Sequence, residues 1–341
     1  MNNIFKLFAC CQPVKGYKRS IIYDIQRIEY FFIPNILYEI LTECKGESIP
    51  AIINKYGDEN VSTINEYFDF LLKNELGFWC HESELELYPD LDLSWDHPSF
   101  ITNAIIDFDA NSRHDLKKIS LELSKLLCLA IQFRFYHVPT IDFLLALLAD
   151  FKNSTARHID IMLPFHSSYS QKALEQLHES NYRLSYVTLF NTKKIRKIES
   201  KQNNFSVFHI KDGIKSEQHC GQINPLHFQN SCNTSFFTEA QSFNSCLNRK
   251  IAIDVQGNIK NCPSLSQHFG NIQDTSLIHV FKKENGLQQY WMISKDQIKV
   301  CRDCEFRYMC TDCRAYTTDP IDLYSKPVKC KYDPYEAEWL P

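Results

Sequence analysis

Short apolar runs alternate with amphipathic stretches through the middle of the chain, and this alternation predicts its largest domain. The predicted strands are 101–108, 131–138, 158–164, 182–190 and 205–210. The predicted helices between them are 115–130, 140–151, which Thr140 caps, and 167–180. Strands that alternate with helices of this length indicate parallel βαβ units with right-handed crossovers. Residues 95–213 are therefore predicted to form a partial βα barrel of the α/β class, with sites at the carboxyl ends of its strands.

Residues 1–90 show a different order, with strands first and helices after them. Two strands are predicted within 19–34, then helices at 35–44, 49–57 and 64–76, then a return strand at 78–81. Ser48 is the predicted cap of the second helix. Thr63 and Glu66 form a predicted capping box for the third helix, which is expected to end at Gly77. This order is typical of a winged helix.

The charge on the last helix of this unit bears on its partner. Its outward positions are mostly acidic or neutral, namely Asn65, Glu66, Asp69, Lys73, Asn74 and Glu75. Phosphate contacts need lysine or arginine, and the whole chain has a net charge of −4 and a pI near 6.3. The sequence therefore favours peptide binding over DNA binding, and a unit that serves only for packing stays a further alternative.

The regular pattern weakens on either side of the central domain. Residues 82–98 are acidic and bounded by proline, which is typical of a linker. The basic run 193–197 is expected to be a solvated helix face. Residues 214–341 have little periodicity apart from a predicted hairpin at 250–262, which turns at Gly257. Such a segment lacks the apolar surface to fold alone, so we expect a metal to hold it together.

Composition excludes several classes of protein. No apolar run approaches the length of a membrane span, and the first 20 residues lack the apolar region of a signal peptide. We therefore expect a cytoplasmic location. The nine glycines include no adjacent pair and fit neither common phosphate-binding motif. In a reducing compartment, fourteen cysteines point to metal binding or catalysis rather than to disulfides.

Seven of the cysteines form an ordered frame near the carboxyl end. They are Cys246, Cys262, Cys301, Cys304, Cys310, Cys313 and Cys330. The two CxxC turns are separated by only five residues, whereas a zinc site usually joins two such turns through a longer loop. Iron–sulfur clusters accept denser runs, and the last cysteine of a run can bind a different cluster. The spacing therefore favours clusters, with zinc as the alternative.

This spacing resembles the SPASM domain, which usually ends radical S-adenosylmethionine enzymes that modify peptides. The last gap here has two residues where three are usual. Two sequence segments resemble a narrower group, the SPASM-domain peptide maturase of grasp-with-spasm systems. They are "NSCLNRKIAIDVQGNIKNCPS" and "KDQIKVCRDCEFRYMCTDCRAY". The resemblance is strongest over residues 214–341 and weaker toward the amino end. It implies two 4Fe–4S clusters, a precursor peptide as partner and an ATP-grasp ligase that acts with the protein.

The resemblance also implies which thiols hold each cluster. The ligands of the second cluster would be Cys301, Cys304, Cys310 and Cys330. The ligands of the first would include Cys246, Cys262 and Cys313. The fourth ligand of the first cluster is either Cys220 or Cys232, and Cys220 is preferred because it follows the last predicted strand, where a barrel mouth would lie.

One expected motif is missing. Radical S-adenosylmethionine chemistry needs a CxxxCxxC loop, and no such spacing occurs in the chain. The middle domain, 95–213, therefore resembles a radical barrel without its catalytic cluster, and we expect no S-adenosylmethionine cofactor. The domain predictions are thus a recognition unit at 1–90, this barrel, and a SPASM domain at 214–341.

The sequence supports a peptide-maturation component more than other functions. The amino-terminal unit would bind the precursor by strand addition, and the cluster domain would hold or orient the peptide. The alternatives are an iron–sulfur electron carrier and a zinc-held interaction or scaffold protein. No nucleophile–base pair follows from local spacing, so the sequence assigns no catalytic residue and leaves open whether the protein is an enzyme. Nucleic acid and membrane are not expected as partners.

Overall fold

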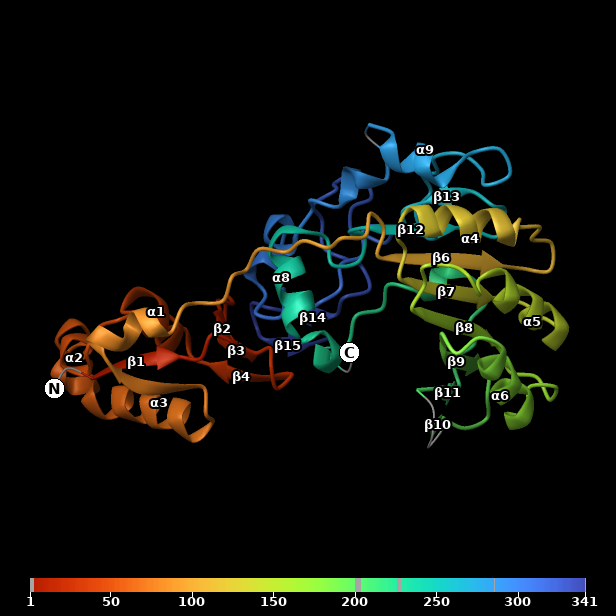
Figure 1. Cartoon of the computed structure of the whole chain (residues 1–341). Helices are drawn as coiled ribbons and strands as arrows, with labels where there is room; N and C mark the ends of the chain where they lie inside the picture. Colours follow the sequence, from red (N-terminus) through yellow and green to blue (C-terminus); the bar gives the residue numbers. More distant parts are fainter. Residues whose placement is uncertain (1–2, 200–203, 226–227, 285, 341) are drawn as a thin grey trace.

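The computed structural model describes residues 3–199, 204–225, 228–284 and 286–340. Its elements form three groups along an elongated molecule (Figure 1). The amino-terminal elements form one end, a large sheet with its helices forms the other, and most of the carboxyl-terminal segment lies between them. None of the described helices is long and apolar enough to cross a membrane.

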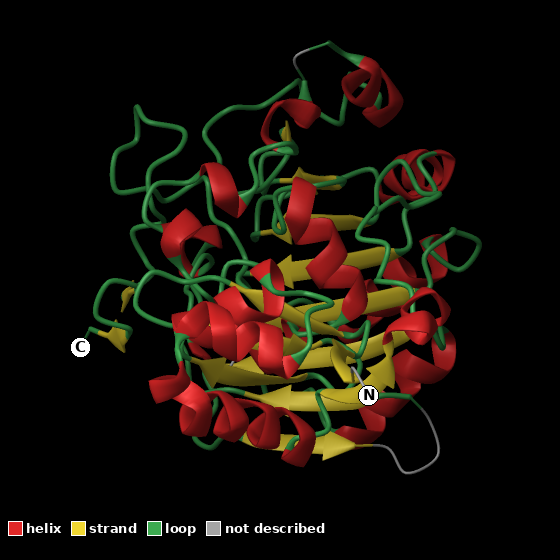
Figure 2. Cartoon of the chain, turned by 90° about the vertical axis from the view of Figure 1, so that its left-hand side faces the viewer, coloured by secondary structure: helices red, strands yellow, loops and turns green. Residues whose placement is uncertain are grey.

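A mostly parallel sheet of eight strands forms the largest group, in the order β10-β11-β9-β8-β7-β6-β12-β13. Its strands are β6 (Asn103–Phe108), β7 (Ala130–Phe135), β8 (His158–Pro164), β9 (Leu184–Phe190), β10 (Arg196–Glu199), β11 (Ser206–His209), β12 (Lys250–Ile253) and β13 (Ile259–Lys260). Figure 2 shows these strands running side by side across the molecule. The sheet confirms the predicted α/β class, and its edges β10 and β13 remain apart in an open sheet.

Three helices cover one face of this sheet: α4 (Leu116–Lys125), α5 (Ile141–Asp150) and α6 (Gln171–Ser180). Asp115, Thr140 and Ser170 cap them, and each side chain accepts a hydrogen bond from the backbone N–H three residues on. The cap at Thr140 confirms the prediction from the sequence. Alternate strand residues such as Ile106 and Phe133 pack against these helices in the main hydrophobic core.

The opposite face of the sheet carries a buried ion pair. Arg134 in β7 donates from Nε and Nη2 to the two oxygens of Asp107 in β6, at 2.6 and 2.7 Å. The hydroxyl of Tyr136 donates to the same carboxylate at 2.9 Å. Asp107 is 1% exposed and Arg134 is 6% exposed. The bidentate geometry therefore compensates two charges that water cannot reach.

The basic run after β9 differs from the prediction. Residues 196–199 form strand β10, which pairs antiparallel with β11 at the edge of the sheet, and not a solvated helix face. The basic side chains do face solvent, since Arg196 and Lys197 are exposed. Charged residues on an edge strand discourage pairing with other chains, so the same composition suits both structures. Residues 200–203 lie outside the described residues.

The amino-terminal group combines two small sheets with three helices. Its elements are β1 (Asn3–Leu7), β2 (Cys11–Val14), β3 (Ser20–Asp24), β4 (Glu29–Ile33), α1 (Asn35–Glu43), α2 (Ile49–Tyr56), a 3₁₀ turn (Asp58–Asn60), α3 (Val61–Lys73), β5 (Gly77–His81) and a 3₁₀ turn (Glu82–Leu87). Strands β2, β3 and β4 form one antiparallel sheet, and β1 pairs with β5 in the other. The predicted return strand is therefore present, whereas β1 and β2 were not predicted.

The third helix differs from the prediction at both ends. It begins at Val61, after Asn60, so Thr63 lies inside the first turn and the predicted capping box does not form. It ends at Lys73, and Gly77 instead begins β5. The 3₁₀ turn Asp58–Asn60 continues without a break into the helix. The helix therefore begins at Val61, three residues before the predicted start at residue 64.

Strand β3 is buried on both faces. Its residue Ile22 packs with the helices of the amino-terminal group in one hydrophobic cluster. Its residues Ile21 and Tyr23 pack in another cluster with Phe306 and Met309 from the carboxyl-terminal segment. The β2–β4 sheet therefore joins the amino-terminal group to the cysteine-rich segment.

The carboxyl-terminal segment is largely irregular, as predicted. It contains α7 (Phe228–Ser231), α8 (Thr234–Ser242), α9 (Leu277–Lys282), β14 (Tyr332–Asp333), β15 (Glu338–Trp339) and the 3₁₀ turns Glu217–His219, Leu287–Tyr290, Lys295–Gln297 and Cys301–Asp303. The predicted hairpin is β12–β13. Gly257 in its turn has φ of +86°, and an added Cβ would lie 3.0 Å from Asn271, so glycine is needed there.

We expect Asp107→Asn to destabilise the sheet by about 3–5 kcal/mol, because it leaves the Arg134 guanidinium buried without an opposing charge. Urea unfolding followed by tryptophan fluorescence and far-UV circular dichroism measures the loss. Glu179→Gln, which neutralises an exposed carboxylate on α6, is the matched control and should change stability by less than about 0.5 kcal/mol. Equal effects of the two substitutions would contradict the assignment of a stabilising buried pair.

Candidate metal centre

Four cysteines, three from one ten-residue run and one from further along the chain, line one pocket. They are Cys301, Cys304, Cys310 and Cys330, and the pocket is narrow, with a cavity volume of about 20 Å³. The first two come from the 3₁₀ turn Cys301–Asp303 and the residue after it. Cys330 reaches the pocket because its backbone forms a parallel bridge with Ile223. We call these four residues frame B.

A buried lysine compensates negative charge beside frame B. Lys295 is 3% exposed, and its Nζ lies 3.9 Å from Sγ of Cys301 and 3.2 Å from Oδ1 of Asp312. Arg314 donates from Nη2 to the same Asp312 oxygen at 2.8 Å. Burial alone would lower the pKa of Lys295, but Cys301, Cys310 and Asp312 outweigh it and raise that pKa well above its usual value. The ammonium therefore stays charged and is held against the sulfur pocket.

Three thiols of frame B, those of Cys301, Cys304 and Cys310, are protonated in the absence of a metal. Burial raises the pKa of Cys310 to about 12. Burial also raises the pKa of Cys301 and Cys304, and Lys295 lowers that of Cys301 in part. Metals bind thiolates and not thiols, so a metal or cluster must displace these protons. The affinity of frame B for a metal is therefore expected to rise with pH.

A second group of cysteines lies at the base of the β12–β13 hairpin. Cys246 precedes β12 and Cys262 follows β13, so the hairpin brings the two thiols together, and both pack in one hydrophobic cluster. Burial and the nearby Cys246 raise the pKa of Cys262 to about 12. Burial, with a contribution from Cys246, also raises the pKa of Cys313. Lys250, the first residue of β12, donates from Nζ to Sγ of Cys246 at 3.3 Å.

Cys220 lies near this second group, and Cys232 lies elsewhere. Gly221 has φ of +84°, and an added Cβ would lie 2.9 Å from Sγ of Cys313, so only glycine lets this loop approach the sulfur. Cys220 is exposed and close enough to contribute to the raised pKa of Cys262. Cys232 is buried elsewhere, with its Sγ 3.1 Å from the carbonyl oxygen of Glu29. We call Cys220, Cys246, Cys262 and Cys313 frame A.

Two side chains tie the frames together. The Asn244 amide donates to Oδ2 of Asp312 at 2.7 Å, and its Oδ1 accepts from the backbone N–H of Cys246 at 3.1 Å. The Ser245 hydroxyl donates to the carbonyl oxygen of Cys310 at 3.1 Å. The turn that presents Cys246 in frame A is therefore fixed to the run that presents Cys310 in frame B.

A separate trio of ligand atoms lies in the amino-terminal group. Cys10, Cys11 and Asp24 have their sulfur and carboxylate atoms within 4.8 Å of one another, and no other trio among the described residues is as tight. The Asp24 carboxylate is already paired with Arg27. The ligand atoms of frames A and B do not all lie within 4.8 Å of one another. That limit is appropriate for ligands that share a single ion. The ligands of an iron–sulfur cluster bind separate irons and therefore lie farther apart.

The face of the sheet opposite the helices holds a further pocket that the sequence did not reveal. Its cavity volume is about 570 Å³, and it is lined by Gln132, Asp160, Ile161, Met162, Tyr186, Thr188, Lys197, Phe208 and Asn230. Burial raises the pKa of Asp160 to about 6, and its buried Oδ1 has no hydrogen-bond partner among the described residues. Asp160 lies in a regular alternation within β8, so nothing in its local sequence distinguishes it. We call this the open-face pocket.

Comparison with known proteins identifies one segment of the chain. A family model described as an iron–sulfur cluster-binding domain, SPASM, matches residues 245–305. This match confirms the predicted SPASM domain over a span that includes Cys246, Cys262, Cys301 and Cys304. No curated protein matches the chain.

A crystal structure of Streptococcus suis SuiB bound to S-adenosylmethionine is among the solved structures that match. The likeness covers 92% of this chain and 94% of that chain, with 10% identity and a TM-score of 0.35. A likeness at this level supports no inference about the function of this chain.

We expect Cys220 to be alkylated much faster than Cys262 or Cys310 in the metal-free protein. Cys220 is exposed, whereas a pKa of about 12 leaves about one buried thiol in ten thousand ionised at pH 8. Timed iodoacetamide labelling with peptide mass spectrometry measures the three rates. Labelling in urea is the control and should remove the difference. Equal rates in the folded protein would show that the frames are not packed as described.

Proposed function

We propose that this chain is a component of ribosomal peptide maturation that holds two 4Fe–4S clusters and binds a precursor peptide. The observation that carries the proposal is the convergence of Cys301, Cys304, Cys310 and Cys330 on one pocket. The match of residues 245–305 to an iron–sulfur cluster-binding domain supports it. SPASM domains usually belong to peptide-modifying proteins, which gives the substrate class.

In this proposal frame A holds one cluster and frame B holds the other. Each frame offers four thiols and one lysine near a sulfur, the half-buried Lys250 in frame A and the buried Lys295 in frame B. A cluster bound by four thiolates is an anion, so these lysines would offset its charge and influence its reduction potential. When bound, the clusters would supply electron storage or rigid support for the irregular segment.

The proposal includes no radical chemistry. In chain order, β6 is the first strand of the large sheet, and the loop that follows it, residues 109–115, contains no cysteine. The CxxxCxxC motif is also absent from the whole sequence. The protein would therefore act beside an ATP-grasp ligase, which would form the new ester or amide bonds. Its own residues would bind and orient the peptide.

Two regions are suited to the peptide. The amino-terminal group has four strands, three helices and a return strand in that order, and we propose that it acts as a winged-helix-like unit that recognises a peptide through strand addition. The open-face pocket offers polar and aromatic side chains, including Asp160, Tyr186 and Lys197. The first region would hold the leader of the precursor and the second would receive the part to be modified.

Anaerobic reconstitution tests the clusters. We expect about eight irons and eight sulfides per chain, as two four-iron clusters require. Cys220→Ser should alter the electron paramagnetic resonance signal of one cluster, whereas Cys232→Ser, which removes a thiol outside both frames, should leave both signals unchanged. The opposite result would assign the eighth ligand to Cys232. Two zincs and no iron in anaerobically purified protein would select the zinc-held alternative.

Binding and turnover test the role in maturation. We expect calorimetry to detect binding of the cognate precursor peptide, and addition of this protein to stimulate the ATP-grasp ligase on that peptide. The reduced, reconstituted protein should form no 5′-deoxyadenosine from S-adenosylmethionine. Neither binding nor stimulation would contradict the maturation role, and formation of 5′-deoxyadenosine would contradict the absence of radical chemistry. Redox turnover without peptide binding would favour an electron carrier.

A further inference from the structure

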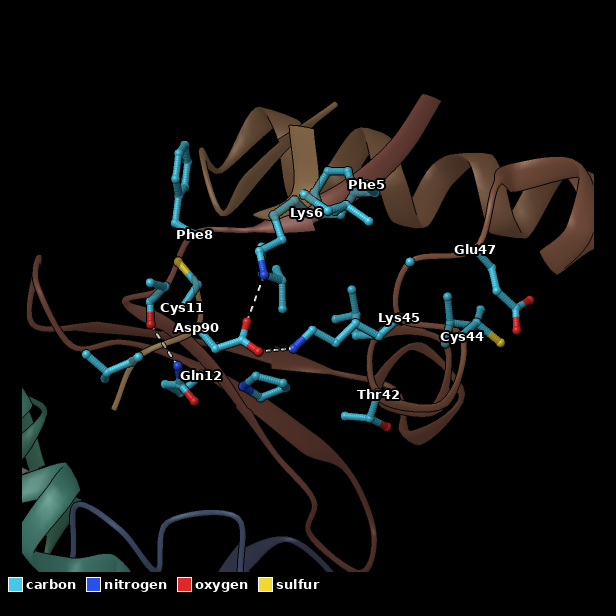
Figure 3. Close-up of a pocket in the computed structure, with 18 of the residues that line it drawn as sticks. Phe5, Lys6, Phe8, Cys11, Gln12, Thr42, Cys44, Lys45, Glu47 and Asp90 are labelled. Carbon is cyan, nitrogen blue, oxygen red and sulfur yellow. Dashed lines mark hydrogen bonds and ion pairs between the residues drawn. The ribbon is translucent and has the colours of Figure 1, made fainter. Parts of the chain in front are cut away.

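A large pocket lies in the amino-terminal group, between β1, the end of α1 and the linker that leaves this group. Its cavity volume is about 650 Å³, and its walls include Phe5, Leu41, Ile52 and Phe68. Leu85, Asp90, Leu91 and Leu93 of the linker close one side. We call it the linker pocket, and Figure 3 shows its interior.

Two lysines converge on Asp90 inside the linker pocket (Figure 3). Lys6 in β1 donates from Nζ to one carboxylate oxygen at 2.7 Å, and Lys45 pairs with the other oxygen. Hydrogen bonds from Lys45 and Lys6 lower the pKa of Asp90. The Lys6 side chain is only 10% exposed, and an ammonium with so little access to water is costly without an anion. The pocket is therefore built around a carboxylate.

The segment that supplies this carboxylate is fixed near its two ends. Residues 88–98 form no helix or strand, and most of them are exposed. At one end the ring of Tyr88 contacts that of Phe78 with centroids 4.7 Å apart, and at the other Asp96 pairs with Arg249 at 2.8 Å. Between these ends, Leu91 packs against a hydrophobic cluster and Asp90 pairs with its two lysines, although the Asp90 side chain is 61% exposed. Residues 89–94 can therefore leave the pocket when the Asp90 ion pairs and the packing of Leu91 break, while both ends stay in place.

The wall formed by β1 has an edge that can accept another strand. One edge of β1 pairs with β5 along its whole length. On the other edge, only Ile4 has a bridge partner among the described residues, namely Ser48. Residues 5–9 of this wall line the pocket. An extended peptide can add to such an edge through main-chain hydrogen bonds while pockets select its side chains.

We propose that the linker pocket binds an extended acidic segment of the precursor peptide, with one carboxylate between Lys6 and Lys45 and apolar residues beside it. Asp90 then holds this place until the peptide displaces it. The linker sequence "PDLDL", residues 89–93, shows the pattern that the pocket accepts. The apolar walls favour a peptide over free phosphate. The identity of the partner rests on the proposed function, but the chemistry of the pocket does not.

A peptide copied from the linker tests this proposal without a known precursor. A fluorescein-labelled peptide with the sequence of residues 85–95 is titrated with the full chain, and its fluorescence anisotropy is followed. While Asp90 occupies the pocket, the peptide cannot bind, so the apparent affinity is reduced to the fraction of molecules whose pocket is free. Asp90→Asn weakens this occupation, so this variant should bind the peptide at least about tenfold more tightly than the parent. Asp92→Asn is the matched control, since Asp92 neighbours the same site but caps the backbone of Ser94, and should leave affinity unchanged.

A second set of variants locates the peptide carboxylate. Adding Lys45→Met to Asp90→Asn should reverse the gain, and this exposed lysine can be replaced without disturbing the fold. A peptide with asparagine at the position of Asp90 should bind Asp90→Asn at least about tenfold more weakly than the acidic peptide. Inorganic phosphate at matched ionic strength should not compete.

Several results would overturn the proposal. They are equal affinity of the parent and Asp90→Asn, equal gains from Asp90→Asn and Asp92→Asn, equal binding of the acidic and asparagine peptides, and full competition by phosphate. None of these results depends on iron content or on ligase stimulation. A precursor that binds the parent, Asp90→Asn and Lys45→Met equally would leave the maturation role intact and place its site elsewhere.

Discussion

Burial of strand β3 on both faces is the constraint on which the arrangement of this molecule depends. Ile22 packs into the core beneath the amino-terminal helices, and Tyr23 packs into the core beneath the cysteine-rich segment. The Tyr23 hydroxyl also donates to the backbone carbonyl of Glu305 at 2.6 Å, and Arg19 pairs with the Glu305 side chain at 2.8 Å. Because Glu305 directly follows Cys304, the amino-terminal group is packed directly against frame B.

Charge compensation is the second common theme. Burial alone would lower the pKa of Lys250, but Cys246, Cys262 and Cys220 raise it, as the thiols of frame B do for Lys295. Each frame thus has one cation near a sulfur, half-buried in frame A and buried in frame B. An uncompensated group of four thiolates would be unfavourable in such a setting. The two lysines would offset the charge of anionic clusters in the frames, as the proposed function requires.

Local patterns predicted much of the fold, and distant contacts account for most of what they missed. Strand β8 lies at the predicted residues 158–164 because its alternation is strict. Strands β1 and β10 depend on partners elsewhere, and their own sequences are too short or too charged to reveal them. Cysteine spacing indicated the SPASM domain that matches residues 245–305, since ligand spacing is itself a local signal, and the two ligand sets stay a prediction. Lys295, Asp160 and the clamp on Asp90 were not predicted, because their environments form only when distant segments meet.

The parallel pairing of β12 with β6 affects the stage of folding at which frame A could bind a metal. Lys250 pairs with Asn103 and Ile253 pairs with Ile106, so this ladder joins segments that are far apart along the chain. Contacts between such distant segments form late and slowly. The hairpin that brings Cys246 and Cys262 together is anchored by this ladder, so we expect the thiols of frame A to come together only after the sheet has folded. Cofactor insertion would then act as a checkpoint that distinguishes finished molecules from incomplete ones.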